Sequence, residues 1–240
     1  ALYALEIKEG GACINYGTGA FFMRHTGTDC HFFPGLLTSV AVTHGKQSKY
    51  LLEGPVNACS TVFAWLSALG IEIKQEELDT LCAAAKEPIS LLPALGGLGA
   101  PYWDFKLSPV MAGFSPRTTK ADVALGTVES LANLLADIVF YTAKCGISAT
   151  QIKVAGGLSK SRALLQSQAD ILQLPLVPCA ESESTALGAA LLGAKVANID
   201  TVQWKTLELL PSVKPQLPAE QAKSKYEKWQ AFVSWCKAGK

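Results

Sequence analysis

The first part of the chain alternates between apolar and polar positions, the pattern of half-buried β-strands. Residues 13–16 and 20–23 are predicted to form two strands joined by the tight turn Gly17-Thr18-Gly19. Residues 36–43 and 48–52 predict a second hairpin around the polar break at 44–47. We therefore expect the chain to begin with antiparallel β-sheet.

Farther along, the apolar positions recur every three or four residues, the spacing of one helical face. The longest helix is predicted around the apolar positions from Leu125 to Val139, and Thr119 with Asp122 resembles a capping box at its start. A segment rich in Gly and Pro, 91–117, is predicted to be a long ordered loop with one short strand at 110–114. The other predicted elements are, in order, helix 57–69, helix 76–85, strand 151–155, helix 161–172, strand 176–178 and helix 184–197.

The order of these elements indicates the fold class. Strands that alternate with helices after the loop predict an α/β domain with a mixed, partly parallel sheet flanked by helices. Residues 184–190 are so rich in Ala and Gly that we expect this helix to pack closely on a neighbour. A C-terminal tail, 201–240, carries an amphipathic helix at 218–237 that is expected to pack on the core. With no repeat or low-complexity linker, residues 1–240 are predicted to form a single domain.

Composition narrows the classes of function. Apolar residues make up 49% of the chain and charged residues 17%, with a net charge of +1, so no basic face favours nucleic acid. No apolar run reaches the about 20 residues that are needed to span a bilayer, and we expect no signal peptide. The seven cysteines form no C-x-x-C pair. We expect a cytoplasmic protein with reduced thiols that acts on a small molecule, without a nucleic-acid or membrane partner.

Two glycine turns are candidates for phosphate binding. In Gly17-Thr18-Gly19 the missing Cβ atoms leave successive amides open to an anion, although a plain hairpin turn would use the same residues. Gly156-Gly157 follows a predicted strand and precedes a helix start, an arrangement that brings ligands to the carboxyl edge of a sheet. An ordinary strand-to-helix turn is the alternative. Because no Walker loop or G-x-G-x-x-G is present, a nucleotide would need another geometry.

Considered together, five motifs resemble the FGGY family of carbohydrate kinases in their order and spacing. The resemblance covers about residues 1–200 and is greatest to the glycerol kinase branch, through Tyr16-Gly17-Thr18-Gly19, Ala100-Pro101-Tyr102-Trp103 and residues 168–172. It implies an actin-like ATPase fold, related to ribonuclease H, and the C-terminal nucleotide-binding domain of a two-domain kinase. The five motifs lie at 16–19, 51–54, 93–103, 155–157 and 184–190.

The resemblance also implies roles for the matching residues. Thr18 would contact the terminal phosphates of ATP, which acts with Mg²⁺, and the paired glycines would lie against the adenosine. Phe21 would pack on the carbon skeleton of glycerol, with ordinary core packing as the alternative. The implied ATP-binding residues are Gly17, Thr18, Gly19, Ser60, Gly156, Gly157 and Ser161.

Some positions depart from the family pattern. Ala155 stands where an acidic residue is usual, Ala64 where glycerol kinases carry glutamine, and Ser161 where they carry asparagine. Each change would remove a hydrogen bond to adenosine worth about 1 kcal/mol. The aspartate that accepts the substrate proton in this family precedes the segment matching Ala1, so we expect no catalytic residue in this chain. Asp104, in a loop rich in Gly and Pro, is expected to be a turn residue.

Two functions follow from these expectations. The first is the ATP-binding half of a kinase for glycerol or a related polyol or sugar, inactive without its N-terminal substrate domain. The second is a degenerate or split kinase half that binds nucleotide or a partner without catalysis. The isolated chain is expected to expose Phe21, Phe22 and the loop 96–103 and to self-associate, for example as a homodimer.

Overall fold

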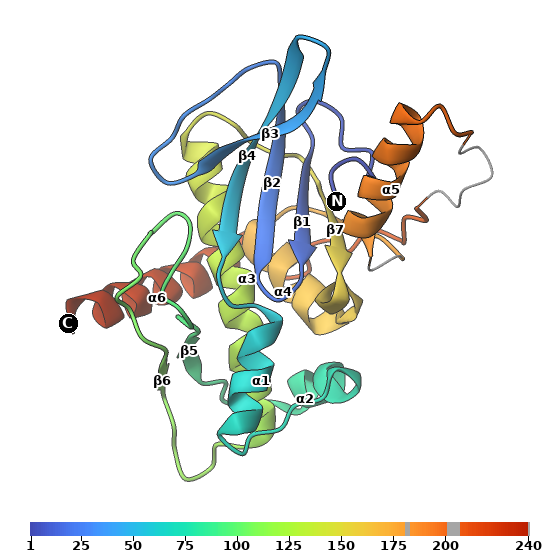
Figure 1. The fold of residues 1–240 in the computed structure, drawn as a ribbon. Helices are drawn as coiled ribbons and strands as arrows, with labels where there is room; N and C mark the ends of the chain where they lie inside the picture. Colours follow the sequence, from blue (N-terminus) through green and yellow to red (C-terminus); the bar gives the residue numbers. More distant parts are fainter. Residues whose placement is uncertain (181–182, 201–206, 240) are drawn as a thin grey trace.

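A six-stranded mixed sheet forms the centre of the molecule in the computed structural model, which describes residues 1–180, 183–200 and 207–239 (Figure 1). The strand order is β3-β4-β2-β1-β7-β8. The pairs β1–β2, β2–β4 and β3–β4 are antiparallel, whereas β1–β7 and β7–β8 are parallel. The strands are β1 Ala12–Tyr16, β2 Ala20–Gly27, β3 Leu37–His44, β4 Gln47–Val56, β7 Ile152–Gly156 and β8 Leu176–Pro178.

Both predicted hairpins and the mixed character of the sheet are confirmed. Strand β4 is longer than expected, because its central residues pair with β2 on one side and with β3 on the other. Two short strands, β5 (Ser90–Leu92) and β6 (Val110–Ala112), form a separate pair. Sequence analysis predicted β6 and missed β5, whose three residues are too few for a periodic pattern.

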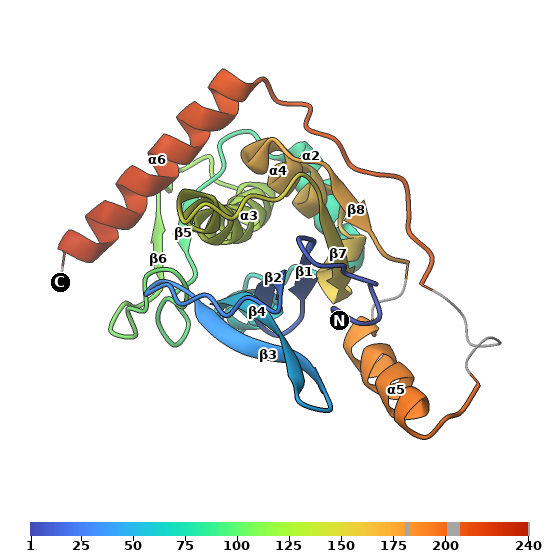
Figure 2. The ribbon, with the colours of Figure 1, turned by 90° about the horizontal axis from the view of Figure 1, so that it is seen from above.

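Helices cover both faces of the sheet unequally. Figure 2 shows α3 (Lys120–Lys144) and α4 (Arg162–Leu172) against one face, with α6 (Ala219–Ala238) crossing outside them. The chain start and α5 (Ser184–Val196) lie on the other side. Near the carboxyl ends of β1 and β7 are α1 (Ser60–Ala68), the short helices η1 (Gln75–Glu77) and η2 (Gly157–Lys160), and α2 (Leu78–Ala84).

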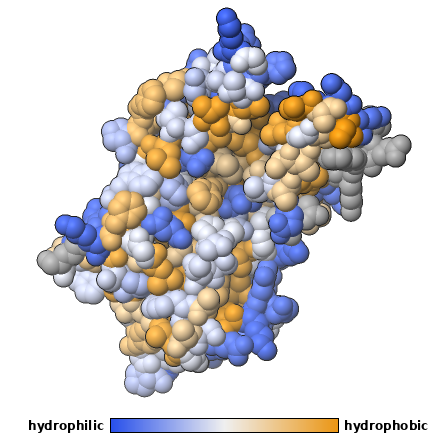
Figure 3. All heavy atoms as spheres, in the orientation of Figure 1, coloured by the Kyte–Doolittle hydropathy of each residue, from blue (hydrophilic) through white to orange (hydrophobic). Residues whose placement is uncertain are grey.

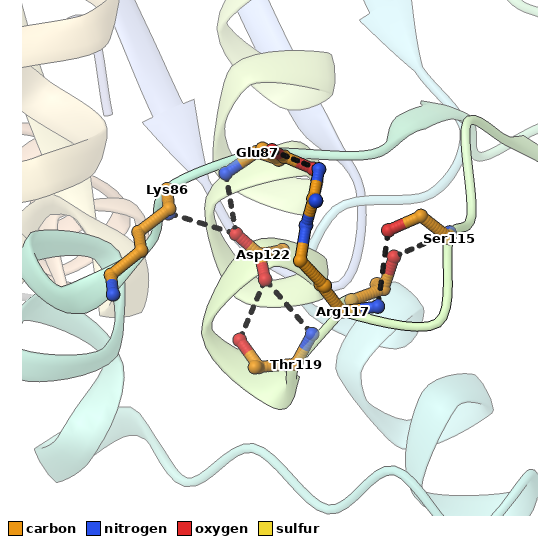
Figure 4. Close-up of polar contacts among 7 residues, drawn as sticks. Lys86, Glu87, Ser115, Arg117, Thr119 and Asp122 are labelled. Atoms are coloured by element: carbon orange, nitrogen blue, oxygen red, sulfur yellow. Dashed lines mark hydrogen bonds and ion pairs between the residues drawn. The ribbon is translucent and has the colours of Figure 1, made fainter.

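The predicted capping box at the start of α3 is present and does more than cap the helix. One carboxylate oxygen of Asp122 accepts from the Thr119 amide at 2.8 Å and from its hydroxyl at 2.6 Å. The other accepts from the amides of Lys86 and Glu87, both at 2.8 Å. These bonds keep the Asp122 pKa well below its ordinary value, and the bond from the Thr119 hydroxyl contributes most. Asp122 thus joins α3 to the segment after α2 (Figure 4).

The long helix α3 is the centre of the main hydrophobic core. By length and composition alone it could cross a membrane, a point that the sequence analysis overlooked, but 83% of its most apolar window is buried inside the protein. Gly54 of β4 lies so close to α3 that an added Cβ would overlap the Ile138 side chain. We therefore interpret α3 as a core helix.

Two expectations about packing need correction. Helix α5 makes its close approach at Gly188, where an added Cβ would lie 3.3 Å from the Ala4 amide, but much of the rest of the helix is exposed. Figure 3 shows apolar side chains gathered over this part of the face. Phe22, expected to be exposed, is buried because it points toward α3, and most of loop 96–103 is also covered. Helix α6 packs against the main core through Trp229 and Val233, and residues 201–206 of the expected tail lie outside the described part.

Candidate functional site

Two glycine turns lie side by side at one edge of the sheet. Strands β1 and β7 are parallel neighbours, and Tyr16 is in register with Gly156. Their carboxyl ends therefore reach the same edge, where the turn at Gly17–Gly19 and the turn at Gly156-Gly157 follow (Figure 1). This is the edge at which open α/β sheets bind ligands.

Glycine is required at position 156 by its surroundings. Its φ angle is +98°, a region that side chains rarely adopt, and an added Cβ would overlap the Tyr16 carbonyl. The next residue is different, because an added Cβ at Gly157 would meet no atom within 4 Å. The first glycine thus lets the two strands approach, and the second leaves open space beside an exposed backbone.

The Gly17–Gly19 turn is a hairpin turn that also fastens the start of α1. Within the turn, the Gly17 amide donates to the Gly19 carbonyl at 2.8 Å. The Cys59 amide donates to the Thr18 carbonyl at 2.9 Å, and the Ser60 amide to the Gly17 carbonyl at 3.2 Å. The side chains of Thr18 and Ser60 remain exposed. The turn is thus a hairpin turn, and the Gly17 amide that was expected to be open to an anion is engaged within it. Because the Thr18 side chain is exposed, phosphate binding through its hydroxyl stays a prediction.

The segment before α2 forms a hydrogen bond to the second glycine turn. The Gln75 side-chain amide of η1 donates to the Gly157 carbonyl at 2.7 Å, and the Ser159 hydroxyl donates to the Gly156 carbonyl at 2.7 Å. The residues from α1 to α2 therefore touch both turns. Sequence analysis did not identify Gln75, and only its position ahead of a predicted helix could have suggested it.

The start of α4 is capped by Asp79 of α2. The Ser161 hydroxyl donates to Asp79 at 2.6 Å, and the amides of Arg162 and Ala163 donate to the same carboxylate at 3.0 Å. Burial opposes ionisation of Asp79, but these bonds outweigh it and lower its pKa. The amino end of α4, which the sequence suggested as an anion site, is thus already occupied by a carboxylate. Ser161 is buried, and its oxygen also accepts from the Leu164 amide.

The remaining residues singled out from the sequence lie in different surroundings. Phe21 is 40% exposed and stands opposite Asn15 on the face of the sheet away from Phe22. Ala64 is exposed on α1, about one helical turn after Ser60. Ala155 is fully buried and packs with Leu5, which leaves no acidic group before the paired glycines.

Two aspartates near the loop 98–105 have structural roles. Asp104 accepts from the Lys106 amide at 3.1 Å, as expected of a turn residue. Asp137 of α3, which sequence analysis missed, is 4% exposed and accepts hydrogen bonds from four side chains. Burial raises its pKa to about 6 even though the four bonds act in the opposite direction. The donors are Tyr102, Tyr226, Trp229 and Gln230.

Metal-binding side chains do not gather in the part of the chain that the structure describes. No group of three or more His, Cys, Asp or Glu residues there could hold an ion. All seven cysteines are free thiols, five of them buried, and burial raises the pKa of Cys13 and Cys59 to about 12. The polar groups described at the glycine-turn edge are backbone groups, the hydroxyls of Thr18, Ser60 and Ser159, and the Gln75 amide.

Comparison with known proteins places this geometry in context. The model of the FGGY family of carbohydrate kinases, C-terminal domain, matches residues 12–197. A glycerol kinase from Paraburkholderia phymatum is 35% identical over 251 aligned positions, which cover 99% of this chain and 50% of the relative. An apulose kinase from Pectobacterium atrosepticum is 32% identical, covering 98% and 48%. The chain thus spans about half the length of these curated relatives.

Solved structures confirm the fold. The crystal structure of Plasmodium falciparum glycerol kinase with ADP matches with a TM-score of 0.84 at 24% identity, covering 98% of this chain and 49% of that one. A xylulose kinase from Lactobacillus acidophilus matches with a TM-score of 0.79 at 21% identity, covering 99% and 49%. The predicted actin-like ATPase fold, with a mixed sheet flanked by helices, is confirmed.

Proposed function

The chain belongs to the FGGY family of carbohydrate kinases, and we propose that it is the ATP-binding half of an enzyme that phosphorylates glycerol or a related polyol or sugar. The observation that carries the proposal is the meeting of the exposed Thr18 turn, the start of α1 and the exposed Gly157 at one sheet edge. Such an edge offers backbone and hydroxyl groups to a ligand with phosphates.

We assign the nucleotide contacts as follows. The Thr18 hydroxyl, between Gly17 and Gly19, would bind the terminal phosphates, and the open space beside Gly157 would take the adenosine. Ser60 would line the same edge from α1. ATP, bound with Mg²⁺, supplies the phosphoryl group, and we assign no residue of this chain as a ligand of the ion. Ser161 would act indirectly, because its hydroxyl is held by Asp79.

Residues 1–240 are proposed to be one nucleotide-binding domain with its C-terminal tail packed on it. The sugar-binding domain and the base that accepts the hydroxyl proton would come from a further part of the protein, since the chain spans about half of its relatives. Phe21, partly exposed beside the turn, would then pack on the carbon skeleton of the substrate. Without that base and that domain, we expect this chain alone to be inactive.

A second candidate function is a module that binds nucleotide or a partner without catalysis. Buried Ala155 and the occupied Ser161 hydroxyl favour it, because both reduce the polar contacts available to adenosine. The two candidates differ in one measurable outcome. Only the kinase transfers phosphate from ATP to a polyol or ketose when the complete protein is assayed against a panel of both, starting with glycerol.

Nucleotide binding is tested by calorimetry of this chain with ATP and ADP. We expect Thr18→Val and Gly157→Val to weaken binding at least about tenfold, the effect of losing a charge-assisted hydrogen bond or the open space. Thr28→Val, a matched change at an exposed threonine away from the turns, should leave binding unchanged. Equal binding by all three variants would show that Thr18 and Gly157 do not form the nucleotide site, even if the protein proves to be a kinase.

We also propose a cytoplasmic location and self-association of the isolated chain. Exposed apolar side chains such as Val196 (85% exposed) and Val40 (57% exposed) support self-association. Light scattering at high concentration is the measurement, and a clean monomer would contradict it.

A further inference from the structure

A cavity lies away from the glycine turns, between α3, α4, α6 and residues 88–91. Its volume is about 370 Å³, within the range of roughly 300–1,000 Å³ that is usual for small-molecule sites. The residues that line it belong to none of the nucleotide contacts assigned above. Figure 2 shows the three helices side by side on the face of the sheet opposite α5.

Asn133 of α3 contributes a buried polar atom without a partner. This residue lines the cavity and is 8% exposed. Its Nδ2 donates to the Glu129 carbonyl at 2.8 Å, which fixes the amide orientation, because a flipped amide would set two oxygens against each other. Its Oδ1 accepts no hydrogen bond from the described residues. A buried acceptor of this kind is costly to leave unpaired, so it favours a ligand that carries a donor.

The other lining groups define the rest of that ligand. Trp229, Phe232 and Ile171 offer apolar surface. Most of the lining charges are already engaged: Glu129 pairs with Lys225 at 2.7 Å, and Asp170 accepts from two backbone amides. Lys228 is exposed and lines the cavity with no hydrogen-bond or ion-pair partner among the described residues. The free charge in the lining is therefore positive.

We propose that this cavity binds a small amphiphilic monoanion. A hydroxyl or N–H group of the ligand donates to Asn133 Oδ1, an apolar body packs on Trp229 and Phe232, and a carboxylate meets Lys228 at the opening. Charge-assisted bonds to lysine and neutral bonds to a buried amide both discriminate strongly between related ligands. The site is independent of the nucleotide site and stands whether or not the chain is part of a kinase.

The probe for the test is 4-hydroxyphenylacetate, which has all three features. The isotope-labelled chain is titrated and the Trp229 indole signal is followed by NMR, after assignment by its loss in Trp229→Phe. We expect a saturable shift. Phenylacetate, without the hydroxyl, and 4-hydroxyphenylethanol, without the carboxylate, should each bind about tenfold more weakly.

Variants then locate the ligand within the cavity. Asn133→Leu should erase the preference for the hydroxyl, and Lys228→Met the preference for the carboxylate. Lys223→Met, at an exposed lysine of α6 outside the cavity, should change neither. Thermal unfolding shows whether each variant folds. If Asn133→Leu does not fold, Asn133→Ser tests the same preference for the hydroxyl.

Two results would overturn the proposal. One is the absence of a saturable shift with all three compounds, which would mean that water alone satisfies Asn133. The other is that both preferences persist in folded Asn133 and Lys228 variants, which would place the compounds elsewhere.

Discussion

The glycine-turn edge and the contact between α3 and α6 handle polar groups in opposite ways. At the edge, the Thr18 side chain and the Gly157 backbone are exposed, and an added Cβ at Gly157 meets open space. Between α3 and α6, the Asp137 carboxylate is 4% exposed and holds four donors. In this protein a buried carboxyl group with four donors joins Tyr102 and α6 to α3, whereas exposed backbone beside glycine offers a place for a ligand.

The largest expected loss of stability comes from a substitution at the glycine-turn edge, where β1 and β7 lie close together. Gly156→Val should lower the free energy of unfolding by about 4 kcal/mol, because the variant combines a strained positive φ with overlap on the Tyr16 carbonyl. Urea unfolding measures it. The neighbouring change Gly157→Ala should stay within about 0.5 kcal/mol of the parent. A loss below about 1 kcal/mol in Gly156→Val would show that β7 can move away from β1.

The second largest effect is expected from removing the buried Asp137 carboxylate between α3 and α6. Asp137→Ala should cost about 3 kcal/mol, because it leaves four buried donors without their acceptor. Hydrogen exchange should report faster opening of α6 than in the parent. Glu227→Ala, at an exposed acid of the same helix, should have little effect. Unchanged protection of α6 would mean that its apolar contacts alone hold it in place.

The pH dependence sharpens the role of Asp137. Its folded-state pKa, about 6, lies above the ordinary value of 3.8 because burial outweighs the four hydrogen bonds. Its stabilising contribution is complete below pH 3.8 and is lost as the pH rises through about 6. The stability of the parent relative to Asp137→Asn should therefore fall by about 2 kcal/mol between pH 4 and pH 7. A difference independent of pH would contradict the raised pKa.

A smaller effect is expected where α2 caps α4. Asp79→Ala should lower the free energy of unfolding by about 1 kcal/mol, as for the loss of a helix cap. Because hydrogen bonding lowers the Asp79 pKa, this stabilisation exists above pH 3.8 and is lost on further acidification. Urea titrations near neutral pH and near pH 3 measure both. Glu72→Ala, also exposed, serves as the control.

The smallest effect on stability is expected at Thr18. Its side chain is exposed, so Thr18→Val should change the free energy of unfolding by less than about 0.5 kcal/mol. The same variant is expected to weaken ATP binding. A change that affects binding but not stability would distinguish the glycine-turn edge from the buried site at Asp137. A large loss of stability would instead show that Thr18 stabilises the fold, as Asp137 does.

Local patterns in the sequence were enough to predict much of the fold. The hairpins follow from alternation, and the start of α3 follows from Thr119 and Asp122, which lie three residues apart. The glycine turns could be located in the same way. That they meet could be inferred only from the resemblance, because the pairing of Tyr16 with Gly156 joins distant segments.

Contacts between distant residues explain what the sequence analysis missed. Ser161 and Asp79 are 82 positions apart, and no local pattern indicates that one caps the helix of the other. Strand β5 exists only through its pairing with β6. Phe21 and Phe22 were treated alike, although neighbouring strand residues face opposite sides, so that one of them had to be buried.

The bonds from α6 to Asp137 have a consequence for synthesis on the ribosome. Trp229 follows Asp137 by 92 positions, so α3 leaves the ribosome long before the indole that will bind its carboxylate. Tyr102, made earlier, is the only one of the four donors that can reach Asp137 in the growing chain. Until α6 emerges, three of the four donors to Asp137 are absent from the nascent chain. The bonding of this carboxylate is therefore completed by the arrival of the last helix and not by completion of the sheet.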